Sequence, residues 1–166
     1  MKVKILYTTP QLCGLVVLRV LVGWHFLYEG IVKILNPKWT SYAYLMDAKG
    51  IFRKGYHFIA DNPGFLKIVN ILNEWGLFLI GLSLITGCLT RMSTIGAMAL
   101  LAVYYLSHIP FVGADYLLPS EGAYLWVDKN LIEIAVLFVL LVFPTSRITG
   151  IDRFIFKDQA KVKPVK

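Results

Sequence analysis

Four apolar segments restrict the fold of this sequence more than any other feature. They cover residues 11–35, 68–89, 92–109 and 124–143. A transmembrane helix needs roughly 20 largely apolar residues to cross about 30 Å of hydrocarbon. Hydrophobic residues make up 57% of the chain and charged residues 16%, with a mean hydropathy of +0.65. This is more apolar surface than a soluble core of this size can hide, so we predict an integral membrane protein.

Helix-breaking residues follow the apolar segments. Asn36-Pro37 ends the first, Pro110 the third and Pro144 the fourth, because proline disrupts helical hydrogen bonding. Thr90-Arg91 predicts a tight charged turn after the second. Only helices or closed barrels satisfy the backbone in lipid, and the runs lack the alternation of a barrel. We predict an all-α bundle of four transmembrane helices, with residues 1–166 forming a single membrane domain.

The start of the fourth segment is open from sequence. Residues 131–143 are short for a span, whereas extension back to Tyr124 includes Asp128, Lys129 and Asn130. We predict the longer segment, residues 124–143.

Lysine and arginine in the flanks predict the orientation. With four spans, one side of the membrane carries Lys2, Lys4, Arg91, Arg147, Arg153, Lys157, Lys161, Lys163 and Lys166. The opposite side has fewer basic residues, all within the loop of residues 36–67. We therefore place both termini, and a basic tail of residues 147–166, in the cytoplasm of a bacterial inner membrane. The net charge of +7 lies at segment ends, which argues against nucleic acid as a partner.

The loop of residues 36–67 is rich in aromatic side chains. These are Trp39, Tyr42, Tyr44, Phe52, Tyr56, Phe58 and Phe65. Aromatic residues concentrate at the headgroup level of membranes. The pattern predicts an interfacial loop of short amphipathic helices, with breaks at Gly50 and Gly55. A simple surface connector is the alternative.

Ionisable residues inside a span usually face the bundle interior. The first segment has four of them, Arg19, His25, Glu29 and Lys33, within an arc of about 120° at helical periodicity. His25 and Glu29 are spaced to touch directly as an i,i+4 pair. For Arg19 we predict a structural salt bridge.

The other spans contribute further polar residues to the outer half of the bilayer. We predict a site whose catalytic residues are His25, Glu29, Glu74, His108 and Glu133, supported structurally by Arg19, Lys33, Asn73 and Asn130. Buried polar groups that tie helices together are the structural alternative for each. No metal site is predicted, because Cys13 and Cys88 form no ligand motif.

Small residues in the spans permit close approach of helices. They are Gly23, Gly30, Gly76, Gly81, Gly87 and Gly96. They bear on the fold and not on the chemistry.

Four motifs in order resemble the DoxX family of small four-helix membrane proteins. The first is Arg19-x3-Gly23-x2-Phe26-x3-Gly30-x2-Lys33 followed by Asn36-Pro37, and the second is Asn73-Glu74 with a glycine-rich run to Arg91. The third runs from Glu121 to Glu133, and the last is Gly150-Ile151-Asp152. The resemblance implies the fold and, through the thiosulfate:quinone oxidoreductase subunits, a link to quinone.

Three functions follow as hypotheses. The first is a redox-linked subunit that binds a quinone or another small molecule in the outer half, with electrons from a partner subunit or directly from substrate. The sequence has no nucleotide-binding or haem-attachment motif, and a haem between His25 and His108 is disfavoured by their different depths. The second is a non-catalytic assembly or structural subunit. The third is a small proton-coupled transporter, which would require an oligomer.

Overall fold

The computed structural model describes residues 7–49, 52–109, 116 and 126–156. Its elements in these ranges are eight helices. They are α1 (Thr9–Leu35), α2 (Tyr42–Met46), α3 (Arg53–Asp61), α4 (Pro63–Thr86), α5 (Thr90–Ser107), α6 (Lys129–Val142), α7 (Ser146–Thr149) and α8 (Asp152–Ile155).

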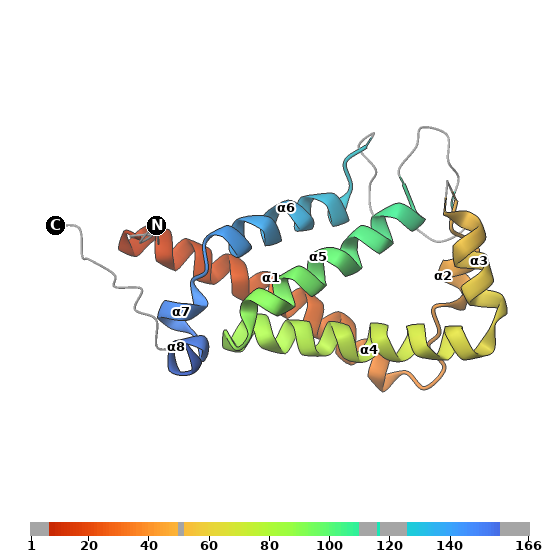
Figure 1. Cartoon of the computed structure of the whole chain (residues 1–166), viewed down its shortest axis with the longest axis horizontal. Coiled ribbons are helices and arrows are strands. Elements are labelled where there is room, and N and C mark those ends of the chain that lie inside the picture. The colour runs from red at the N-terminus through yellow and green to blue at the C-terminus, as the bar shows by residue number, and fades with distance from the viewer. Residues whose placement is uncertain (1–6, 50–51, 110–115, 117–125, 157–166) are drawn as a thin grey trace.

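The four longest helices pack side by side (Figure 1). α1 lies along α4 and α5 lies along α6, while α4 also contacts α5 and α1 contacts α6. The short helices α2 and α3 lie at one end of this bundle, and α7 and α8 lie at the other end, beside the α4–α5 turn; α1 also starts at that end. The described chain therefore begins and ends at the same end of the bundle.

α1 closely matches the predicted segment 11–35. Thr8 caps the helix in a capping box with Gln11, and Pro10 stands in the first turn, where its missing N–H costs nothing. Asn36 is the C-terminal cap, as expected from Asn36-Pro37.

The turn between α4 and α5 lies slightly earlier than predicted. Gly87 has φ 71° and Leu89 has φ 52°, so both adopt the left-handed conformation. Gly87 caps the end of α4, and Leu89 caps the start of α5. Thr90 and Arg91 already belong to α5, and the prediction of a turn at these two residues was wrong. The position of the turn is determined by Gly87, which adopts positive φ readily, and not by the charge of Arg91.

Two details of the predicted interfacial loop are also wrong. Gly55 lies inside α3 and not at a break, while Gly50 lies outside the described residues. α4 starts at Pro63, so residues 63–67, assigned to the loop, are helical. The helix can start at Pro63 because proline is favoured in the first turn of a helix. Lys67 does not interrupt it, because a charged side chain is compatible with a helix near its end.

α6 is shorter than the predicted segment 124–143. It begins at Lys129, where the Asp128 side chain accepts the N–H of Leu131; residues 124 and 125 lie outside the described residues. Its 14 residues span about 21 Å, less than a hydrocarbon core. Within the described chain, two helices, α1 and α4, are long and apolar enough to cross a membrane. The four-span count stays a prediction.

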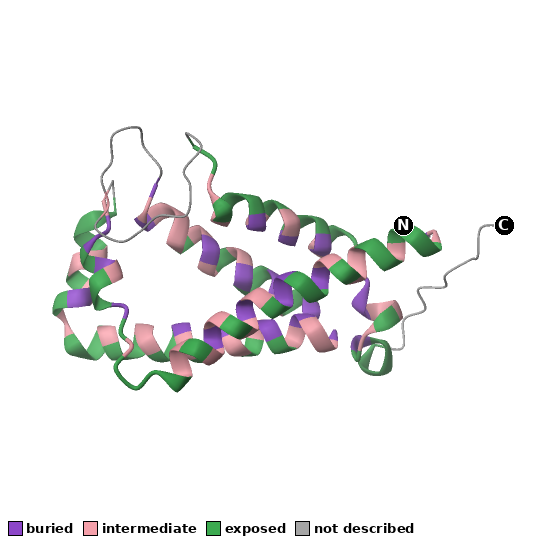
Figure 2. Ribbon diagram, turned by 180° about the vertical axis from the view of Figure 1, so that it is seen from behind, coloured by how far each residue is buried: buried purple, intermediate pink, exposed green. Residues whose placement is uncertain are grey.

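The bundle has an apolar core and an apolar outer surface. Phe26, Leu84, Ala97 and Leu137 are buried where the four helices meet. Figure 2 shows buried positions along the inward faces of the long helices and exposed positions along the outward faces. The outward faces still carry large apolar side chains, including Leu21, Trp24, Leu72, Leu79, Met92 and Phe138. An outer surface of this kind is suited to lipid.

Three of the six glycines allow α1 and α4 to approach closely. A Cβ at Gly23, Gly30 or Gly81 would lie within 3.0 Å of the facing helix, which is too close for a side chain. Among the described residues, a Cβ at Gly76 would have no neighbour within 4 Å, and the nearest atom to a Cβ at Gly96 would be 3.9 Å away. The prediction of close helix approach was therefore wrong for these two.

Candidate functional site

A histidine on α1 and a glutamate on α6 form a partly buried polar contact between these two helices. His25 Nδ1 lies 2.8 Å from Glu133 Oε1. The Glu133 side chain is 9% exposed and the His25 side chain 36%. The second carboxylate oxygen, Oε2, is buried and has no hydrogen-bond partner among the described residues. The pair therefore has an unused acceptor beside a partly accessible imidazole.

Glu29 lies one turn beyond His25 and pairs with Lys33. The Lys33 ammonium donates to the Glu29 carboxylate and also approaches the Trp39 ring, 5.6 Å from its centroid. The spacing of His25 and Glu29 allows direct contact, but their hydrogen-bond partners in the structure are Glu133 and Lys33 respectively. A glutamate four residues before a lysine is the favoured helical pair, and His25 binds Glu133 instead. Glu29 still lies close enough to His25 to interact with it electrostatically.

In the described part of the chain, no hydrogen bond joins Asn73, Glu74 or Asn130 to His25 or Glu133. Asn73 is buried beside the Tyr104 hydroxyl, and its Oδ1 has no hydrogen bond in the described part of the chain. Asn130 donates to the Asp128 carboxylate at 2.8 Å. Glu74 is half-buried, and none of the described residues pairs with its carboxylate.

His108 belongs to a second polar group, at the end of α5. Its Nε2 lies 3.5 Å from Asp47 Oδ2 and its Nδ1 lies 2.9 Å from Ser107 Oγ. The His108 ring stacks on Tyr44 and also contacts the tilted ring of Tyr116, at centroid distances of 4.2 and 4.8 Å. Of the five residues predicted to be catalytic, the structure thus brings His25 into contact with Glu133, with Glu29 nearby, and places His108 in a different group.

Sequence reasoning missed most of this second group. Tyr44 was read only as a membrane-interface aromatic, yet its hydroxyl lies 2.9 Å from Ser107 Oγ and donates to the Tyr104 carbonyl at 3.3 Å. Burial raises the pKa of Tyr44 to about 12, against a smaller lowering by the hydrogen bond with Ser107. The spacing of Asp47 and His108 gives no sign of their contact, because the loop must first fold onto the end of α5.

Arg19 lies toward the opposite end of the bundle, where its side chain contacts the segment that leads into α7. Its Nη1 donates to Thr145 Oγ1 at 3.1 Å, and Arg19 also interacts electrostatically with Asp152. The Asp152 carboxylate accepts the backbone N–H groups of Leu89, at 2.6 Å, and Thr90, at 3.1 Å. A salt bridge was predicted for Arg19, but its direct hydrogen bond goes to the Thr145 hydroxyl. Together, the contacts of Arg19 and Asp152 join α1, the α4–α5 turn and α8.

No cluster of three or more histidine, cysteine or acidic side chains suited to a metal is found in the ranges 7–49, 52–109 and 126–156. Cys13 and Cys88 are free thiols.

Comparison with protein families gives one match: the DoxX family model covers residues 14–109. The chain belongs to the DoxX family. Neither curated proteins nor solved structures match it. The DoxX match contains His25 and Glu29 but ends before Glu133. The partner of His25 therefore comes from a part of the chain outside the matched DoxX region.

Proposed function

We propose that this DoxX family membrane protein is a redox-linked subunit that binds a quinone headgroup between α1 and α6. The observation that carries the proposal is the His25–Glu133 contact, with an unpartnered carboxylate oxygen beside a partly exposed imidazole. Polar groups inside a membrane protein are functional candidates because they are costly to bury.

The donor set fits a quinone. A quinone headgroup has two carbonyl oxygens that need hydrogen-bond donors, and an imidazole N–H or a protonated carboxyl supplies one. A bound quinone would accept electrons and protons. In its protonated form, His25 would donate Nδ1–H to Glu133 and keep Nε2–H for a quinone carbonyl. Glu29 would exchange protons toward the outer end of α1. Electrons would come from a partner subunit or from the substrate.

Titration with decylubiquinone, followed through tryptophan fluorescence, tests the proposal because Trp24 adjoins His25. Removal of one charged hydrogen-bond partner costs about 1.5–3 kcal/mol, so Glu133→Gln should weaken binding by roughly tenfold or more. Asp61→Asn makes the same acid-to-amide change at an exposed position on α3; it is the matched control and should bind normally. Equal affinities in wild type and Glu133→Gln, or no binding by wild type, would contradict the proposal.

The proposal includes four spans with both termini in the cytoplasm. The basic residues near α7 and α8 support this orientation by the positive-inside rule. In a background with Cys13 and Cys88 replaced by serine, a membrane-impermeant maleimide should label Lys38→Cys in intact cells. Arg153→Cys should be labelled only after membrane disruption. Labelling of both from outside would rule out the four-span count.

A non-catalytic assembly subunit is the second candidate. It is favoured by the position of the His25–Glu133 contact, which links two helices that otherwise touch little. In that case Glu133→Gln lowers thermal stability, and decylubiquinone has no effect on either protein.

A further inference from the structure

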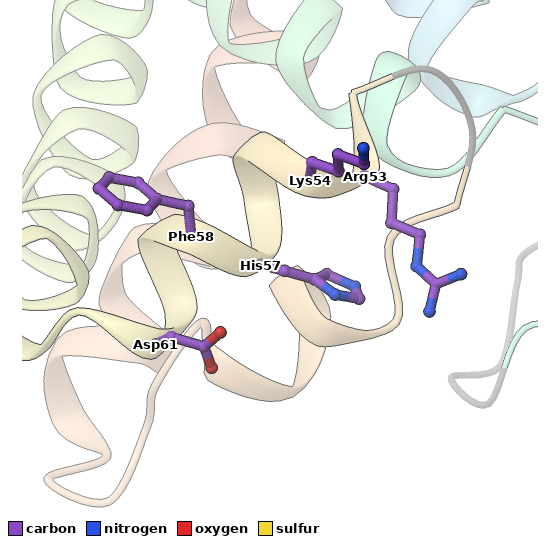
Figure 3. Close-up of a pocket in the computed structure, with 5 residues that line it drawn as sticks. All are labelled: Arg53, Lys54, His57, Phe58 and Asp61. Carbon is purple, nitrogen blue, oxygen red and sulfur yellow. The ribbon is translucent and has the colours of Figure 1, made fainter.

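α3 carries a basic hollow that no contact described above uses. Arg53, Lys54, His57, Phe58 and Asp61 line it, and these residues are called the α3 hollow. Figure 3 shows Arg53, His57 and Asp61 following one another along one side of α3, with Phe58 directed away from them. The spacing of four residues accounts for this row. We propose that the α3 hollow binds the phosphate of an anionic phospholipid headgroup.

The charges of the hollow favour an anion. Arg53 and Lys54 stand in the first turn of α3, which has no acidic residue, and neither has an ion pair in the described part of the chain. The positive end of the helix dipole adds to their charge. A guanidinium can bind two phosphate oxygens at once. Asp61 lies at the opposite end of the row, so its negative charge does not neutralise the positive charge of Arg53 and Lys54 in the first turn.

His57 supplies a further ligand. Its Nε2 is buried and has no hydrogen-bond partner among the described residues. A buried polar atom of this kind costs free energy until it is paired. A headgroup oxygen in the hollow would be its partner.

The surroundings of the hollow favour a lipid over free phosphate. Phe58 packs against Phe65 of α4 with ring centroids 5.7 Å apart. Phe52, Phe58, Phe65 and Ile68 are all more than half exposed. Exposed apolar side chains beside a cationic hollow are arranged to hold acyl chains next to a phosphate. The proposal is independent of the quinone site.

Binding of dioctanoyl phosphatidylglycerol to the purified full-length chain tests the proposal. Each basic residue near a membrane surface contributes about 1 kcal/mol to anionic lipid binding, so Arg53→Gln/Lys54→Gln should weaken binding by roughly thirtyfold. Lys38→Gln/Lys67→Gln removes the same charge from outside the hollow and is the matched control, with little loss expected. An equal loss in the two double variants would overturn the proposal.

A second variant tests the hollow in the opposite direction. Asp61→Asn removes the acidic residue among the described residues that line the α3 hollow and should strengthen phosphatidylglycerol binding severalfold. Inorganic phosphate and dioctanoyl phosphatidylcholine should bind far more weakly than phosphatidylglycerol. Phosphate binding as tight as lipid binding would assign the hollow to a free anion, and equal binding of phosphatidylcholine would remove the role of charge. Either result would overturn the proposal.

Discussion

His25 Nδ1 on α1 lies 2.8 Å from Glu133 Oε1 on α6, although the two residues are 108 positions apart. α1 packs mainly on α4, and α6 mainly on α5. The contact is therefore a polar link between two helix pairs. Its remaining carboxylate oxygen is buried and unpartnered in the described chain.

Gly81→Ala should destabilise the protein strongly. A Cβ at this position would lie 2.3 Å from the Leu27 nitrogen and 2.6 Å from the Gly23 carbonyl oxygen, so α1 and α4 must separate. Overpacking of this kind costs roughly 1–3 kcal/mol. Gly76→Ala, in the same helix with nothing within 4 Å, should be neutral or stabilising by up to about 1 kcal/mol. Thermal unfolding in detergent compares the two, and similar losses would contradict the close packing of α1 on α4.

Asp152→Asn should also lower stability. The carboxylate accepts the N–H groups of Leu89 and Thr90, and an amide offers one oxygen and a donor in its place. Leaving a buried N–H without a partner costs about 1–3 kcal/mol. Arg153→Gln changes the exposed neighbour and is the control. An unchanged midpoint of thermal unfolding for Asp152→Asn would show that the α4–α5 turn does not depend on α8.

Tyr44→Phe should weaken the docking of α2 on α5 and change its pH dependence. The loss of the hydrogen bonds with Ser107 and the Tyr104 carbonyl costs about 1–2 kcal/mol. Because burial raises the pKa of Tyr44 to about 12 from its ordinary 10.0, its neutral form stabilises the fold below pH 10. That contribution is lost as the pH rises from 10 toward 12.

Thermal unfolding at pH 8 and pH 11 measures this effect. Wild type should lose more stability over the interval than Tyr44→Phe, while Tyr42→Phe, at an exposed position of the same helix, should follow wild type. A steeper alkaline loss in Tyr44→Phe than in wild type would be inconsistent with a buried phenol.

The sequence allowed the long helices to be predicted but not the partners of their polar side chains. Long apolar runs locate α1 and α4 because lipid leaves few other choices of backbone structure. The start of α4 was missed because Lys67 was taken as a loop residue, although a charge near a helix end is tolerated. The start of α6 was missed because Asp128 was taken as part of the helix. The hydrogen bond that it accepts from Leu131 N–H, which marks it as the N-terminal cap, is seen only in the structure.

Side-chain pairing depends on tertiary structure. Glu29 has His25 and Lys33 at equal spacing along α1, and periodicity alone cannot choose between them. In the structure, Glu133 of α6 binds His25, and Glu29 pairs with Lys33. In the same way His108 meets Asp47 only after the loop has folded onto the end of α5.

Photoaffinity labelling with an azidoquinone tests the central proposal most directly. The reconstituted protein is irradiated with the probe, and the labelled peptides are identified by mass spectrometry. The proposed site predicts labels next to His25 on α1 and next to Glu133 on α6, both suppressed by excess decylubiquinone. Labels confined to the lipid-facing surfaces, or unchanged by the competitor, would contradict a quinone site between these two helices.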